Sequence, residues 1–284
     1  MTEEQEWDIV IEPKSSLFAL NLKEVWKYKD LLLLFVRRDF VAEYKQTILG
    51  PLWYLIQPVF TAFTYLFILN KMGGIPTDGM PPMLFYLSGL TVWGYFSSSL
   101  TKVSDTFIAN SNIFGKVYFP RLIVPLSIIT SNLIKLGLQF ALLLFFMAYF
   151  HFTNDDFTFT FRVELLLLPL PILLMAGLSL GMGLLISSMT TKYRDLKFAL
   201  TFGVQLLMYG SAVIISLNTV SEEFRNILKW NPIANVVELF RAVLLGNHPI
   251  EWFGVIYSAV FLVVLLIIGT IIFNKTEKTF MDTV

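Results

Sequence analysis

The pair Gly115-Lys116 is the first candidate for chemistry in this sequence. It lies in the stretch NSNIFGKVYFPR, residues 110–121, and a glycine followed by a lysine ends a phosphate-binding loop. That loop also needs a glycine five residues before the first of the pair and a hydroxyl residue after the lysine. Those positions hold Asn110 and Val117. We therefore exclude a nucleotide site in this stretch.

No other group of residues forms a catalytic or metal-binding pattern. The chain has no cysteine, which excludes zinc thiolate sites and thiol catalysis. His151 and His248 have no partners at ligand spacing, and Asp155-Asp156 is typical of a solvated turn. We expect no catalytic residue, no metal and no cofactor on this chain.

The composition predicts a protein whose main solvent is lipid. Hydrophobic residues make up 56% of the 284 residues and charged residues 15%, whereas soluble domains have roughly 45–50% and about 25%. The net charge of zero argues against a nucleic-acid partner. The first residues, MTEEQEWD, contain no apolar segment, so we expect no cleaved signal peptide.

Long uncharged stretches predict the elements that position these residues. A helix that crosses about 30 Å of hydrocarbon needs about 20 apolar residues. We predict an all-α integral membrane protein with six transmembrane helices, near 52–70, 82–106, 122–150, 165–188, 198–217 and 252–273. The loops on the side of the two termini hold 15 Lys and Arg residues, against 5 on the other side, so both termini and residues 110–121 should be cytoplasmic.

Several residues inside the predicted spans could serve either packing or transport. Lys135 in the third span costs about 2.5–3.5 kcal/mol in hydrocarbon, so it either faces a pathway or interface, or extends to the cytoplasmic surface. Trp53, Tyr54 and Tyr65 either pack and face lipid or line a path for sugars. In the fourth span, the G-x-x-x-G pair at 177 and 181 predicts close helix packing.

Two segments outside the spans should also be helical. Residues 20–37 combine apolar residues, including the run Leu31–Phe35, with basic residues, and the apolar run is too short to cross, which predicts an amphipathic helix in the plane of the interface. Residues 222–246 predict a re-entrant pair of short helices on the outer side, with Asn231 as the N-cap and Pro232 in the first turn. Glu238 and Arg241, three residues apart, should pair as a local brace or as a latch.

The aromatic and basic loop 110–121 itself has two interpretations. It is either a turn at the membrane surface or a knob that docks into a groove on a cytoplasmic partner.

Several motifs resemble one family of transporters. The segment RRDFVAEYKQTILGPLWYLIQP at 37–58, the tripeptide FPR at 119–121 and the segment NPIANVVELFRAVLLG at 231–246 are similar to the permease subunits of polysaccharide ABC exporters. Those type-2 ABC permeases export O-antigen, teichoic acid and capsule chains. The resemblance covers nearly the whole chain in the same order.

The resemblance implies a division of labour between subunits. Two copies of the chain would form one channel as a homodimer, and each copy would dock on an ATP-binding subunit that holds ATP and Mg²⁺. The ATPase-coupling residues would be Phe114, Gly115, Lys116, Tyr118, Phe119 and Arg121, with Tyr193 and Arg194 of the loop TKYRDLK as a second contact. Residues 1–45 would be a cytoplasmic segment with the interface helix, and 46–284 the permease domain with external gate helices at 222–246.

We therefore expect a multi-pass permease of a bacterial inner membrane. An undecaprenyl-type lipid-linked glycan would enter near Arg37, Arg38 and Lys45 among the membrane lipids. It would pass Trp53, Tyr54, Tyr65 and Lys135 and leave past Asn231, Pro232, Glu238 and Arg241. Alternatives are a teichoic acid or capsule exporter, a drug exporter, and a membrane-embedded glycosyl- or phosphotransferase.

Overall fold

The structure is a computed structural model that describes residues 22–153, 157–246 and 248–280. The described residues form helices and connecting segments without a β-strand, which confirms the predicted all-α class. The Asp155-Asp156 turn and residues 1–21 of the predicted N-terminal segment lie outside the described residues.

Four long helical segments are apolar enough to cross a membrane. They are Gly50–Met72, Ile123–Thr153, Val163–Lys192 and Trp252–Lys278. The first combines the 3₁₀ turn η1 (Gly50–Leu52), α3 (Trp53–Tyr65) and a π-helical end η2 (Leu66–Met72), and the third combines η3 (Val163–Leu167) with α8 (Pro169–Lys192). The other two are α7 (Ile123–Thr153) and α12 (Trp252–Phe280). The chain is therefore a multi-pass membrane protein.

The remaining two predicted spans differ from these four. The helix α4 (Pro82–Ser104) has the expected length, but it is rich in Ser, Thr and Gly and most of its residues are buried between α7 and α8. The predicted helix at 198–217 is wrong in extent, because α9 (Leu196–Tyr209) ends at Gly210 and the chain continues as turns.

The shorter helices lie at the two ends and along one side of the bundle. Beyond α9 they are α1 (Leu22–Lys27), α2 (Lys29–Tyr44), α5 (Thr106–Ala109), α6 (Ser111–Phe114), α10 (Glu222–Leu228) and α11 (Pro232–Leu245). The last two are the predicted pair of short helices.

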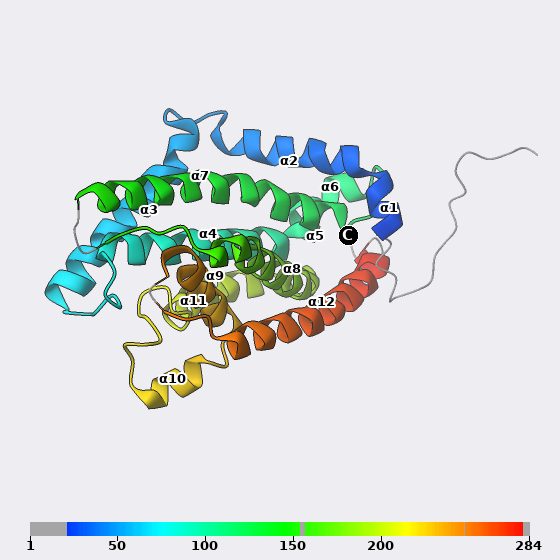
Figure 1. The fold of residues 1–284 in the computed structure, drawn as a ribbon. Helices are drawn as coiled ribbons and strands as arrows, with labels where there is room; N and C mark the ends of the chain where they lie inside the picture. Colours follow the sequence, from blue (N-terminus) through cyan, green and yellow to red (C-terminus); the bar gives the residue numbers. More distant parts are fainter. Residues whose placement is uncertain (1–21, 154–156, 247, 281–284) are drawn as a thin grey trace, which may run out of the picture.

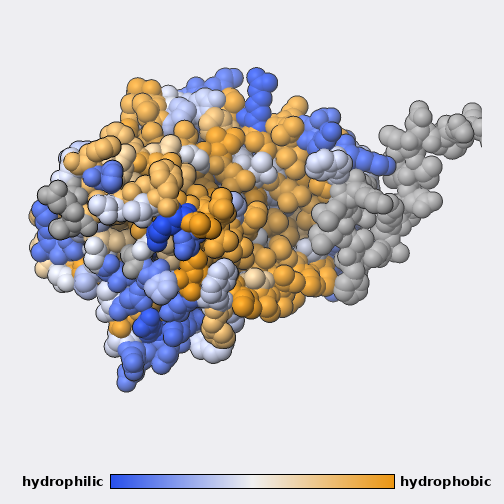
Figure 2. Space-filling view, in the orientation of Figure 1, coloured by the Kyte–Doolittle hydropathy of each residue, from blue (hydrophilic) through white to orange (hydrophobic). Residues whose placement is uncertain are grey.

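The long helices run side by side, and the described chain begins and ends at the same end of the bundle (Figure 1). The short helices α5 and α6 lie at that end too. The helix α2 runs beside α7 and does not cross the end of the bundle. The position of residues 20–37 in the plane of the membrane interface stays a prediction. Hydrophobic side chains cover the middle of the face over α8 and α12, and hydrophilic ones gather around α10 (Figure 2).

The two helices α8 and α12 approach each other closely at small residues. A Cβ atom on Gly269 would lie 2.7 Å from the carbonyl oxygen of Gly181, so a side chain there would push the helices apart. This close contact confirms the packing role that the G-x-x-x-G pair in α8 predicts.

Candidate functional site

The loop 110–121 presents a short exposed turn at the end of the bundle. Gly115, Lys116, Val117 and Tyr118 are exposed, with 63% of Tyr118 accessible. Phe114 and Phe119, on either side of this turn, are instead buried. The surface that a partner could touch is therefore the four-residue turn 115–118, and the two phenylalanines hold it in place.

These two phenylalanines belong to a cluster of five rings that we call the phenylalanine cluster: Phe35, Phe107, Phe114, Phe119 and Phe273. Ring centroids lie 5.7 Å apart between Phe35 and Phe119, 5.7 Å between Phe114 and Phe119, and 4.6 Å between Phe107 and Phe273. The rings come from α2, α5, α6, the loop and α12. The exposed turn thus rests on side chains from four helices.

Arg121 ties the same loop to the last helix. Its Nη1 donates to the carbonyl oxygen of Glu277 at 2.5 Å, its Nε lies 3.8 Å from the Glu277 carboxylate, and its guanidinium lies 5.4 Å from the Phe114 ring. Burial lowers the pKa of Arg121, and the Glu277 charge partly opposes this shift. These contacts mean that Arg121 anchors the loop to α12.

The second predicted loop, 191–197, lies at the same end. Tyr193 and Arg194 are exposed. Lys197 Nζ donates to Asp105 Oδ2 at 2.7 Å, and Thr190 donates to the Ser104 carbonyl at 2.9 Å. These contacts join the end of α8 and the start of α9 to the end of α4, so the structure brings the two predicted coupling loops to one end of the bundle.

Inside the bundle, one carboxylate holds two lysines. Glu43, on α2, forms ion pairs with Lys102 of α4 and Lys135 of α7 and accepts a hydrogen bond from the hydroxyl of Tyr54. The ammonium of Lys135 also lies 5.1 Å from the Tyr54 ring. Lys135 is therefore paired within the bundle and does not extend to its end.

The other residues predicted to meet the substrate do not gather here. Trp53 is half exposed on α3, and Tyr65 packs edge-on against Tyr86 with centroids 5.8 Å apart. Arg37 and Lys45, which lie before and after Glu43 in the sequence, are exposed. Arg38 is bound to Asp39 at 2.7 Å and lies 4.4 Å from the Phe35 ring.

A cavity of about 370 Å³ opens between α2, the ends of α4 to α6, and the first half of α7. Its lining is mixed. Charged residues come from α2 and α4, and polar and apolar ones from α6 and α7, including Arg38, Asp39, Glu43, Lys102, Ser131 and Asn132.

At the other end of the bundle, Arg241 on α11 is fully buried and binds two other segments, α4 and the residues after Gly210. It donates to the carbonyl oxygens of Ala212 at 2.5 Å, Val213 at 2.8 Å and Phe85 at 3.2 Å. It also lies 3.2 Å from Glu238, as the spacing predicts. Non-helical backbone inside a membrane protein persists only where protein groups satisfy it. Arg241 therefore satisfies two carbonyl oxygens of the non-helical segment after Gly210.

Asn231 and Pro232 begin α11 as expected. The Asn231 side chain accepts from the Ile233 N–H at 2.9 Å and donates to the Gly210 carbonyl at 2.6 Å. The cap thus also fastens α11 to the turn that follows α9.

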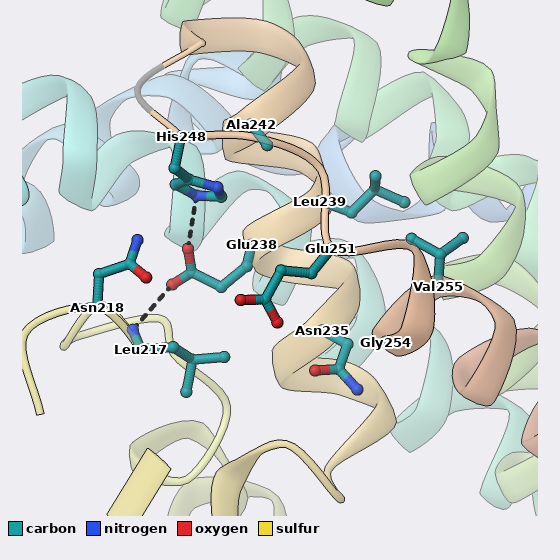
Figure 3. Close-up of a pocket in the computed structure, with 10 residues that line it drawn as sticks. All are labelled: Leu217, Asn218, Asn235, Glu238, Leu239, Ala242, His248, Glu251, Gly254 and Val255. Atoms are coloured by element: carbon teal, nitrogen blue, oxygen red, sulfur yellow. Dashed lines mark hydrogen bonds and ion pairs between the residues drawn. The ribbon is translucent and has the colours of Figure 1, made fainter. Parts of the chain in front are cut away.

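Glu238 lies at the centre of a small outer pocket, with His248 and the Leu217 amide directed at its two oxygens (Figure 3). His248 Nε2 lies 3.0 Å from Glu238 Oε2. Burial lowers the pKa of His248, but the hydrogen bond to Glu238 and the nearby charges outweigh it and raise the pKa above its ordinary value. The pocket has about 30 Å³, enough for a water molecule but not for a sugar.

Known proteins are similar to this chain over most of its length. Residues 30–245 match the ABC-2 type transporter family. The chain belongs to that family. The ABC-2 match includes α2, the loop 110–121 and the Arg241 network, and it favours a transporter over the transferase alternative.

Three relatives of this ABC-2 chain are similar over almost their whole length. The O-antigen export system permease protein RfbA of Klebsiella pneumoniae is 28% identical over 89% of this chain and 94% of its own. The protein of the same name in Myxococcus xanthus is 23% identical over 93% and 98%. The polysialic acid transport protein KpsM of Escherichia coli is 25% identical over 83% and 89%.

Several participants in these sites could not be recognised from the sequence. Glu43 is one of them, although an intramembrane Lys135 requires an anionic partner. Phe35 and Phe273 were not linked to the loop, because neither lies near it in sequence. Their apolar character alone does not distinguish them from lipid-facing residues.

Proposed function

We propose that this chain is the permease subunit of an ATP-driven exporter of polysaccharide, an O-antigen-like glycan on a lipid carrier. The observation that carries the proposal is the similarity to O-antigen export permeases over 94% and 98% of their length. No part of those relatives large enough to be a separate domain is missing from this chain. The chain itself performs no chemical step in this proposal.

Energy would enter from a second protein at the end of the bundle that carries the loops 110–121 and 191–197. An ATP-binding subunit, which holds the ATP and Mg²⁺, would contact Lys116, Tyr118, Tyr193 and Arg194. The exposure of these four side chains supports this contact. Phe114, Phe119 and Arg121 would pass its movement to α2 and α12 through the phenylalanine cluster.

Two copies of the chain would form the complete channel. The proposal is supported by α3 and α9, which contain only Ala62 as a buried residue yet display exposed aromatic side chains, Phe60, Phe63, Phe198 and Phe202 among them. An apolar helix face of this kind packs against lipid or against a second copy. In the dimer, α4 and α9 would complete six crossings per chain, and α10 and α11 would form the external gate.

The chain would lie in a bacterial inner membrane with both termini and the 110–121 loop in the cytoplasm. The lipid-linked glycan, of the undecaprenyl type, would approach the exposed Arg37 and Lys45 from the cytoplasmic leaflet. Because the chain has no cysteine, single-cysteine labelling can test this orientation directly. In the variant Lys116→Cys, an impermeant maleimide added outside intact cells should label the cysteine only after the membrane is permeabilised.

The coupling surface is tested by charge reversal. In the assembled complex, Lys116→Glu with Tyr118→Ala should abolish both export and the ATPase stimulation that the permease provides. Lys71→Glu, an exposed lysine on η2, is the matched control and should export normally. Normal export by the double variant would remove the docking surface from the proposal.

A capsule polysaccharide is the second candidate cargo, and the similarity to the polysialic acid transport protein KpsM favours it over other glycans. Expression in strains that lack either an O-antigen permease or a capsule permease separates the two. Restoration of surface O-antigen alone supports the first assignment, and restoration of capsule alone would replace it.

A further inference from the structure

The cavity beside α2 contains two buried polar atoms that have no partner. The residues Ser131 and Asn132 both line it, and neither Ser131 Oγ nor Asn132 Oδ1 forms a hydrogen bond within the described part of the chain. The residues themselves are only 2% and 1% exposed. Buried polar atoms in folded proteins nearly always have partners, so these two indicate a polar group that occupies the cavity.

The two atoms require different hydrogen-bond partners. A serine hydroxyl can donate, whereas the oxygen of an amide only accepts. The amide nitrogen of Asn132 is already used, because it donates to Ser99 Oγ at 2.9 Å. The occupant must therefore offer an acceptor to Ser131 and a donor to Asn132.

The charges around the cavity leave one cation in surplus. Asp39 is paired with Arg38 and Asp105 with Lys197. The third carboxylate, Glu43, must serve both Lys102 and Lys135. Lys102 lines the cavity and its ammonium carries three N–H donors, so it can bind an anion while it keeps Glu43.

From these observations we infer that the cavity binds a phosphate that carries a sugar. The phosphate oxygens accept from Lys102 and Ser131, and a hydroxyl of the attached sugar donates to Asn132. A volume of about 370 Å³ is in the range of small-ligand sites, roughly 300–1,000 Å³, and is far larger than one water requires. That the sugar phosphate belongs to the lipid-linked cargo rests on the proposed function; the binding site itself does not.

Two variants that act in opposite directions test the site. The probe is a synthetic farnesyl diphosphate linked to N-acetylglucosamine, bound to the full-length permease in nanodiscs. Lys102→Gln should weaken its binding about tenfold or more, because it removes a charge-assisted contact. Glu43→Gln should strengthen binding, because it removes the carboxylate that competes for the two lysines. A purely structural ion pair would make both variants weaker, and that result would overturn the site.

Two further variants address the polar atoms. Ser131→Ala removes no hydrogen bond within the described residues and should weaken binding about three- to tenfold. Asn132→Leu should weaken the sugar-linked probe but leave farnesyl diphosphate unchanged. Lys71→Gln is the control and should bind as the wild type does. Equal loss of both probes in Asn132→Leu, or no loss in Ser131→Ala, contradicts the assigned orientation.

Competition identifies the source of the phosphate and separates this site from the proposed function. Displacement of the probe by phosphatidylglycerol as readily as by unlabelled probe would assign the cavity to bulk lipid headgroups and overturn the sugar. If Lys102→Gln loses binding but still exports glycan, the proposed function stands and the cavity is not on its pathway. If the wild type binds the probe but restores no export, the site stands and the proposed function fails.

Discussion

Replacement of Arg241 by methionine gives the strongest test of how α11 is held. Arg241 supplies donors to the carbonyl oxygens of Ala212, Val213 and Phe85 and balances the charge of Glu238, all without exposure to solvent. Each buried acceptor that loses its donor costs about 1–3 kcal/mol. Removal of one partner from a buried ion pair costs about 3–5 kcal/mol. Since these losses share one side chain and the chain relaxes in part, we expect the variant to lower the free energy of unfolding by about 3–5 kcal/mol.

The measurement is unfolding by a rising fraction of SDS in mixed micelles, followed by tryptophan fluorescence. Arg241→Lys keeps the charge but cannot reach three carbonyls at once, so we expect it to recover only part of the loss. Arg225→Met is the matched control. Arg225 binds Asn218 and Glu251 near the surface, where such pairs contribute about 0–1 kcal/mol.

Equal costs for the buried and the surface arginine would refute this reasoning. The segment after Gly210 would then be held by packing alone, and the network would be incidental to it. A loss in Arg241→Met that Glu238→Gln restores would instead assign the whole effect to the uncompensated carboxylate and none to the carbonyls.

Three further perturbations use the same unfolding measurement or its pH dependence. Gly89→Ala places a methyl group 2.5 Å from the buried guanidinium and should cost about 1–3 kcal/mol, whereas Gly203→Ala, with open space around it, should not destabilise. Phe119→Ala opens the phenylalanine cluster and should cost about 3–5 kcal/mol. The pKa of His248 is raised in the folded state, so its hydrogen bond with Glu238 contributes fully to the stability of the folded protein below the unfolded pKa of ~6.5. That stabilisation is lost as pH rises through the folded pKa, and His248→Gln should flatten this dependence.

The sequence was sufficient for the long helices because they depend on local properties. Uncharged runs of about 20 residues have no alternative to a helix in lipid, and α4, α7, α8 and α12 agree with their predicted ranges. The same logic failed at 210–217. That run is equally uncharged, but its carbonyls are satisfied by a side chain about 30 residues later, and no local pattern encodes such a partner.

The contacts of α2 could not be predicted for a related reason. The amphipathic pattern of α2 is compatible with a membrane surface and with a second helix, and only the packed structure selects α7. Glu43 follows from that choice: with α2 beside α7, its carboxylate meets Lys135. The spacing of Asn231, Pro232 and Glu238 relative to Arg241 was correctly interpreted because caps and i,i+3 pairs are local.

The exposed turn and the cavity share α2, and this has a mechanical consequence. Phe119 of the loop packs against Phe35 of α2, and the cavity is walled by Asp39 and Glu43 one turn or two further along the same helix. Because close-packed side chains transmit displacement instead of absorbing it, we infer that a push on the turn 115–118 moves α2 against α7 and changes the cavity. Spin labels on α2 and α7 should therefore change their separation when the ATP-binding subunit binds ATP. In Phe119→Ala that change should be lost while the sugar phosphate still binds; an unchanged response in this variant would mean that the movement reaches the cavity by another route.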